Sequence, residues 1–231
     1  MDSVKAYKTI VYIDGYNLYY SMLTGSRYKW LDLHLLMGDV IKDAYPNMRA
    51  NIEQIKFFTA PIMGKYASDP ESPNRQTRYH NALKFAPSGY TEVITGKHSE
   101  VIKKGYPTEA GFGNGDPILV TVMEEKQTDV NIGVHMYRDV AQGFAEQIVL
   151  VSGDSDLAPS LELIREDFPH IIRGVVFPIL DSKPNPRRSG TLEKLSSWTR
   201  KSLSEEQLQK CQLPTIVANR KNKAIRKPDN W

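Results

Sequence analysis

Four aspartates stand at positions where an α/β protein usually holds its chemistry. Asp14 closes an apolar, β-branched run over residues 8–14, and Asp154 and Asp156 follow a second such run over 147–152. Asp129 stands at the start of a predicted helix. In a parallel sheet, ligands bind in the crevice at the carboxyl ends of the strands. We therefore expect the four carboxylates to lie near one another at that edge.

Crowded carboxylates repel one another, so at least one is protonated unless a cation lies among them. Mg²⁺ prefers a few carboxylates plus water, and such a site supports in-line attack on a phosphodiester. Each aspartate also has a structural explanation. Asp154 or Asp156 caps a helix that has Pro159 just inside it, and Asp14 makes a turn before Gly15. The coincidence of all four at one edge favours an acidic metal site.

Strands and helices alternate around these residues. Strands are predicted over 8–14, 55–59, 90–96, 147–152 and 171–179, and helices over 17–23, 31–44, 76–85 and from 128 and 157 onward. Because the strands are apolar on both faces, we predict an α/β fold with a mostly parallel sheet and helices on both sides. In the helix from 128, the recurrence of Val130, Val134, Tyr137 and Ala141 predicts the buried stripe. Residues 103–117 are predicted to be a loop, and 118–123 a short strand or a helix start.

The chain changes character after residue 180. Residues 181–231 hold 12 Lys and Arg against 5 Asp and Glu, a balance of +7, so residues 1–180 carry −4 of the total of +3. We predict a domain over 8–180 and a basic C-terminal extension over 181–231, with a helix over 192–203, a short helix opening at Ser204 and an extended tail. An acidic body beside a basic segment suits a protein that holds cations and meets a polyanion. A solvated Lys-rich tail explains the same charge.

Composition excludes several classes of protein. A chain of 231 residues with 40% hydrophobic and 25% charged residues builds a core and is neither disordered throughout nor a coiled coil. No apolar run reaches the ~18 residues of a membrane span, and the polar N-terminus lacks the apolar stretch of a signal peptide. The single cysteine, Cys211, excludes an internal disulfide and a Cys zinc site, and favours a cytoplasmic location.

Three motifs in order carry a family resemblance. Residues 10–20 (IVYIDGYNLYY), 125–130 (EKQTDV) and 150–166 (LVSGDSDLAPSLELIRE) resemble NYN domains, members of the PIN-like nuclease superfamily. The resemblance implies a Rossmann-like, PIN-type three-layer fold and Mg²⁺- or Mn²⁺-dependent cleavage of RNA. It assigns Asp14, Asp129, Asp154 and Asp156 to the acidic cluster as catalytic residues and metal ligands.

Four further residues complete the expected site. Asn17 is the polar partner in the first motif, or caps the helix after Gly15, and Ser152 contacts water or phosphate, or satisfies backbone at a strand end. Lys126 and Arg138 are the expected contacts to RNA phosphates, or ordinary surface charges.

Two other functions stay open. Some stand-alone bacterial NYN-type proteins of this size are described as 6-hydroxy-3-succinoylpyridine hydroxylases, a monooxygenase chemistry that needs a redox cofactor. The run Gly111–Gly115 precedes a possible strand, which is the wrong context for a dinucleotide fingerprint. The third function is a catalytically idle RNA- or partner-binding module. A homo-oligomer is compatible with each.

Overall fold

The computed structural model describes residues 5–46, 48–107, 116–184, 186–229 and 231. Its centre is a six-stranded sheet in the order β3-β2-β1-β6-β7-β8, and every neighbouring pair is parallel. The strands are β1 (Ala6–Asp14), β2 (Arg49–Thr59), β3 (Thr91–Thr95), β6 (Gln147–Val151), β7 (Ile172–Val176) and β8 (Trp198–Arg200). The predicted parallel α/β sheet is confirmed.

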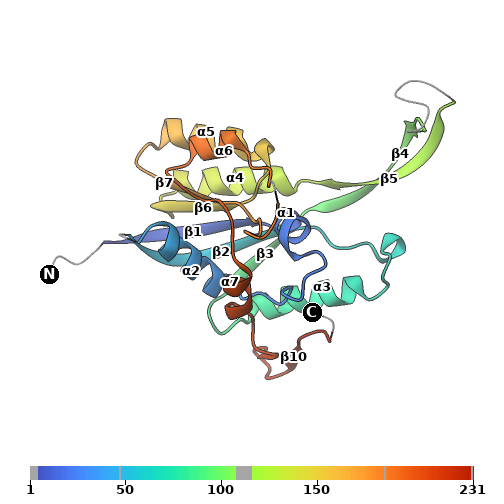
Figure 1. The fold of residues 1–231 in the computed structure, drawn as a ribbon, viewed down its shortest axis with the longest axis horizontal. Coiled ribbons are helices and arrows are strands. Elements are labelled where there is room, and N and C mark those ends of the chain that lie inside the picture. The colour runs from blue at the N-terminus through green and yellow to red at the C-terminus, as the bar shows by residue number, and fades with distance from the viewer. Residues whose placement is uncertain (1–4, 47, 108–115, 185, 230) are drawn as a thin grey trace.

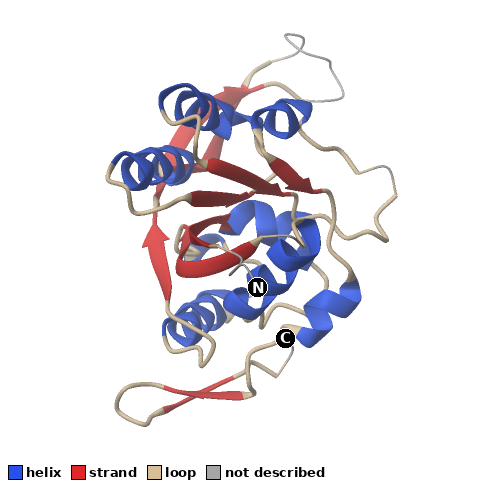
Figure 2. Ribbon diagram, turned by 90° about the vertical axis from the view of Figure 1, so that its left-hand side faces the viewer, coloured by secondary structure: helices blue, strands red, loops and turns tan. Residues whose placement is uncertain are grey.

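Helices cover both faces of this sheet (Figure 2). One layer contains α2 (Leu33–Ala44), α3 (Ser72–Lys84) and α7 (Glu205–Lys210), and the other contains α4 (Thr128–Ala141), α5 (Ala158–Asp167) and α6 (Gly190–Leu195). Each layer has its own apolar core, in which Leu36 of α2 and Leu83 of α3 pack on one face and Met136 of α4 and Leu161 of α5 on the other. The three-layer arrangement is therefore confirmed. Within the described residues, no helix combines the length and apolar character that a membrane crossing requires.

The buried face of α4 differs from the prediction. Val130 and Val134 are 68% and 59% exposed, whereas Ile132 and Met136 are fully buried. Both pairs are four residues apart, so both satisfy the helical period. The packing partner decides between them: Gly133 faces α5 so closely that a Cβ at this position would lie 2.3 Å from Ser160 Oγ.

A two-stranded antiparallel ribbon projects from one end of the sheet (Figure 1). It consists of β4 (Lys97–Gly105) and β5 (Ile118–Lys126). The predicted loop over 103–117 is wrong at its start, because residues 103–105 continue β4. They are held in strand conformation by pairing with β5, in which Lys103 lies opposite Val120. The Gly111–Gly115 run lies outside the described residues. For 118–123 the strand alternative is correct.

The C-terminal segment packs onto the rest of the molecule. The helix predicted over 192–203 is wrong beyond Leu195, because 198–200 form β8, which pairs with the otherwise open edge of β7. The predicted capping box is confirmed: Ser204 and Gln207 bond each other's backbone at the start of α7. A hairpin of β9 (Ile216–Ala218) and β10 (Ala224–Arg226) then folds back against α3.

Candidate metal centre

Asp14 is the most firmly held of the four aspartates. It is the last residue of β1, and only 4% of it is exposed. Its carboxylate caps the short helix α1 (Gly15–Leu18) by accepting from Asn17 N at 2.9 Å, and its second oxygen accepts from Ser152 Oγ at 2.9 Å. Burial raises the pKa of Asp14, and these hydrogen bonds oppose that rise.

Asn17 and Ser152 join the first and third motifs. Asn17 Oδ1 accepts from Gly153 N at 3.0 Å, so its side chain ties α1 to the loop after β6. Ser152, which is fully buried, donates to Asp14 and accepts from Asp154 N at 3.0 Å. Asp14 caps α1, so Asn17 is not the cap, and both predicted polar residues lie where they orient the loop that carries Asp154.

Asp154 and Asp156 follow β6 in this loop. Asp154 Oδ1 accepts from Asp156 N at 3.0 Å and so caps the 3₁₀ turn η4 (Ser155–Leu157). The capping role expected of an isolated aspartate is therefore present. It uses one carboxylate oxygen of Asp154, while Asp156 is exposed.

Asp129 enters the same region from the first turn of α4. Partial burial, followed by repulsion from Asp14 and Asp154 and smaller contributions from Glu125 and Asp156, raises the pKa of Asp129 to about 6. Five carboxylates from three segments of the chain thus interact at one end of the sheet. We call them the acidic cluster: Asp14, Glu125, Asp129, Asp154 and Asp156.

Glu125 was absent from the predicted site residues. Glu125 is the penultimate residue of the ribbon strand β5, and its carboxylate accepts from Thr128 N, the first backbone N–H of α4, at 3.2 Å and from the Thr128 hydroxyl. Gln127 between them adopts a left-handed backbone with φ of 81°, which makes the turn from β5 into α4 tight. The position of Glu125 at the start of the second motif, residues 125–130, is the sequence signal that identifies it as a site residue.

Within the described residues, neither Lys126 nor Arg138 forms an ion pair with a carboxylate of the acidic cluster. Lys126 pairs with Glu124, its neighbour on the ribbon face opposite to Glu125. Arg138 lies in the last turn of α4, nine residues from Asp129 and therefore about 14 Å along the helix axis. A contact from either residue to RNA stays a prediction.

The acidic cluster offers only oxygen donors, the type that Mg²⁺ and Mn²⁺ prefer. Within the ranges that the structure describes, no three Asp, Glu, His or Cys side chains stand in a finished coordination arrangement. Asp14 is fixed by its hydrogen bonds, whereas the side chains of Asp129 and Asp156 remain accessible to solvent. The donor types and their mutual repulsion fit a divalent cation, and we expect binding to complete the geometry.

Comparison with known proteins identifies the family to which the chain belongs. The model of the NYN domain matches residues 8–172, which include all five residues of the acidic cluster. The chain belongs to the NYN domain family. It is 35% identical to the 6-hydroxy-3-succinoylpyridine 3-monooxygenase HspA of Pseudomonas putida, over 97% of this NYN protein and 75% of that one. A solved structure of a protein of unknown function from Vibrio parahaemolyticus shares the fold, with a TM-score of 0.50 and 18% identity over 93% of this chain and 100% of that one.

The raised pKa of Asp129 predicts a stability signature. Aspartate in an unfolded chain has a pKa near 3.9, whereas burial and the repulsion from Asp14 raise the pKa of Asp129 to about 6 in the folded NYN domain. Between these values the folded state binds more protons than the unfolded state, so this group makes stability fall as pH rises. The asparagine of the Asp129→Asn variant is uncharged at every pH. We expect this variant to be more stable than wild type above about pH 6, and to lose the advantage below about pH 4.

Thermal unfolding across this pH range, with chelator and at low salt, checks the prediction, because salt screens exposed carboxylates. Glu166→Gln removes an equal charge from an exposed position on α5 and is the matched control. It should not reproduce the pH-dependent difference. Parallel profiles for wild type and Asp129→Asn would show that the acidic cluster is not electrostatically coupled.

Proposed function

We propose that this NYN protein is a metal-dependent ribonuclease that cleaves RNA phosphodiester bonds at the acidic cluster. The observation that carries the proposal is the convergence of five carboxylates from β1, the β5–α4 turn and the loop after β6. The pKa of Asp129 reflects four of them at once. A cluster of this charge beside the carboxyl ends of the parallel strands β1 and β6 is the arrangement that a hard cation and a phosphate group would share.

The roles of the chain's own residues follow from their contacts. Ser152 and Asn17 hold Asp14 and the loop of Asp154 in register, so two carboxylates reach the site from rigid elements. Asp129 lies at the positive end of the α4 dipole, which offsets part of the repulsion from the neighbouring carboxylates. Bound Mg²⁺ or Mn²⁺ would supply charge stabilisation for the phosphodiester and orient water. Asp156, at the exposed edge, is the residue we expect to be nearest to solvent.

The test is a cleavage assay over single-stranded and structured RNAs with Mg²⁺, with Mn²⁺ and with chelator. Asp154→Asn is expected to lower the metal-dependent rate by about 100-fold, the upper end of the loss seen when even an outer partner of a metal site is removed. Glu166→Gln should cleave as wild type does. Equal cleavage by Asp154→Asn and wild type would exclude the acidic cluster as the active site. RNA binding without cleavage would favour the idle RNA-binding module instead.

A second candidate is hydroxylation of a small pyridine compound. It is favoured by the name of the 35% identical relative and by an aromatic pocket beside the acidic cluster. Such a reaction consumes O₂ and needs a reductant. The test supplies 6-hydroxy-3-succinoylpyridine, O₂ and a reduced nicotinamide nucleotide, and measures substrate loss and nucleotide oxidation. Turnover that survives in Asp154→Asn would assign this chemistry to a site other than the acidic cluster.

A further inference from the structure

A pocket of about 640 Å³ lies beside the acidic cluster. Gly15, the residue after Asp14, forms part of its wall, and so does Glu125. Gly15 has no room for a side chain, because a Cβ there would lie 2.6 Å from Phe57 Cζ and 2.7 Å from Phe58 O. The pocket volume falls in the range typical of small-molecule sites. It therefore has room for one part of a substrate whose reacting bond is at the carboxylates.

One wall of the pocket is a group of three tyrosines. Tyr16 lies on α1, and Tyr19 and Tyr20 lie on the following π-helical turn η1 (Tyr19–Leu23), a rare element that occurs often at functional sites. The rings of Tyr16 and Tyr20 stack with centroids 5.9 Å apart, and Tyr19 meets Tyr20 edge-on at 5.2 Å. Tyr20 is nevertheless 66% exposed. A stacked pair that leaves so much aromatic surface in water offers a face for another planar ring.

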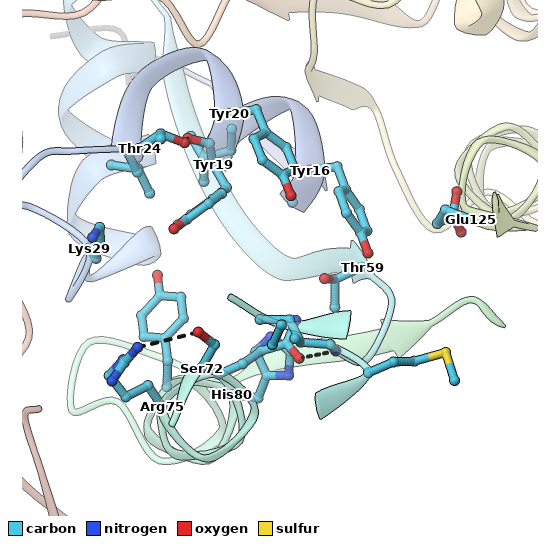
Figure 3. Close-up of a pocket in the computed structure, with 18 of the residues that line it drawn as sticks. Tyr16, Tyr19, Tyr20, Thr24, Lys29, Thr59, Ser72, Arg75, His80 and Glu125 are labelled. Atoms are coloured by element: carbon cyan, nitrogen blue, oxygen red, sulfur yellow. Dashed lines mark hydrogen bonds between the residues drawn. The ribbon is translucent and has the colours of Figure 1, made fainter. Parts of the chain in front are cut away.

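The opposite wall is also aromatic. Tyr79 and His80 of α3 form it together with Trp231, whose ring meets that of Tyr79 at 5.7 Å. Phe57 connects the two walls, because its ring lies against Gly15 and meets the ring of His80 at 5.8 Å. Burial, with a smaller contribution from Lys84, lowers the pKa of His80 to about 4, so its ring is neutral at physiological pH. Figure 3 shows the tyrosines extending toward α3, which carries His80 on the far side of the pocket.

The charges around the pocket are unequally placed. Lys29 is half-buried in the wall and takes part in none of the ion pairs found among the described residues. Arg75 lies nearby but is paired with Asp69. In Figure 3, Lys29 and Arg75 stand at one side and Glu125 at the other. A ligand that spans the pocket would thus place an anionic group near Lys29 and away from Glu125.

We propose that this pocket binds a planar heteroaromatic ring whose attached anionic group contacts Lys29. This chemistry is shared by a nucleotide unit of RNA and by a free pyridine-type acid. The ring stacks on Tyr20 between the two aromatic walls, and its edge lies beside the Tyr16 hydroxyl and His98 Nε2, which are hydrogen-bonded to each other at 2.8 Å. The inference rests on the proposed function for the position of the reacting bond, since it makes the pocket the subsite next to the acidic cluster.

Ring binding is measured by calorimetry in chelator, so that no turnover is involved. The probes are uridine and adenosine 5′-monophosphates and 6-hydroxypyridine-3-carboxylate, with ribose 5-phosphate as the probe that has an anion but no aromatic ring. Tyr20→Ala is expected to weaken the aromatic probes by about 5- to 150-fold, the range for loss of one stacking partner. Tyr20 is exposed, so the variant should fold, and Tyr45→Ala, another exposed tyrosine outside the pocket, should bind as wild type does.

Lys29→Met separates the anion contact from stacking. Neutral uridine is the additional probe that has the aromatic ring but no anion. Lys29→Met should weaken binding of the nucleotides and of the pyridine acid but leave binding of uridine unchanged. Tighter binding of the nucleotides would assign the pocket to RNA, and tighter binding of the pyridine acid would assign it to a small substrate; either supports the ring subsite. Failure of every aromatic probe to bind, or equal binding by Tyr20→Ala and wild type, would overturn it.

The two proposals fail separately. Asp154→Asn should lose cleavage and keep ring binding, because Asp154 does not line the pocket. If wild type does not cleave RNA while binding depends on Tyr20 and Lys29, the ribonuclease proposal fails and the ring subsite stands. If Tyr20→Ala and Lys29→Met cleave RNA as wild type does and no aromatic probe binds, the ring subsite is rejected and the ribonuclease proposal stands.

Discussion

Replacing Asp139 by asparagine is expected to lower the free energy of unfolding by about 3–5 kcal/mol. Asp139 on α4 is 1% exposed and forms an ion pair with Lys56 of β2, which is 3% exposed, at 2.5 Å. Tyr12 donates to the same carboxylate oxygen at 2.8 Å. The amide removes the negative charge and leaves the ammonium of Lys56 buried without its counter-charge. Urea unfolding measures the loss.

Two controls interpret that result. Asp181→Asn changes an exposed aspartate and should stay within about 0.5 kcal/mol of wild type. The double variant Lys56→Met/Asp139→Asn removes both charges, so it should be more stable than Asp139→Asn alone. A single Asp139→Asn variant as stable as wild type would mean that solvent or another group neutralises Lys56 in the folded protein.

Divalent cation is expected to stabilise the folded NYN protein by about 2.7 kcal/mol at a hundredfold excess over its dissociation constant. The carboxylates of the acidic cluster come together only in the folded state, so Mg²⁺ or Mn²⁺ would bind that state in preference to the unfolded chain. Asp14→Asn should abolish most of this stabilisation and relieve repulsion in the metal-free form. The measurement is the melting temperature as a function of cation concentration.

Glu166→Gln serves again as the charge-matched control and should keep the full response to cation. Ca²⁺ and monovalent salt at equal ionic strength separate specific binding from screening. If wild type shows no shift with Mg²⁺ or Mn²⁺ while a known magnesium protein does, the acidic cluster is not a metal site.

The sequence by its local patterns was enough to predict the parallel sheet and the edge at which Asp14 and Asp154 lie. The apolar strands that end at Asp14 and before Asp154 can be predicted from short stretches of sequence, because strand patterns, caps and turns depend on neighbouring residues. The three motifs also led to the NYN family before any coordinates. The proximity of Asp14 and Asp154 followed from one topological rule, that the carboxyl ends of parallel strands share an edge. Asp129 follows the ribbon strand β5, outside the parallel sheet, so this rule does not account for its position.

Only the tertiary structure decided which surfaces face each other. Val130 and Val134 satisfy the helical period as well as Ile132 and Met136 do. The close approach of α5 to α4 decides that the second pair is buried. The pairing of Lys56 with Asp139 joins residues 83 apart, and Trp231 reaches the aromatic pocket because the C-terminal hairpin folds back onto α3. Burial and charge pairing depend on elements that are distant in sequence, and one chain read by itself contains no local signal for such contacts.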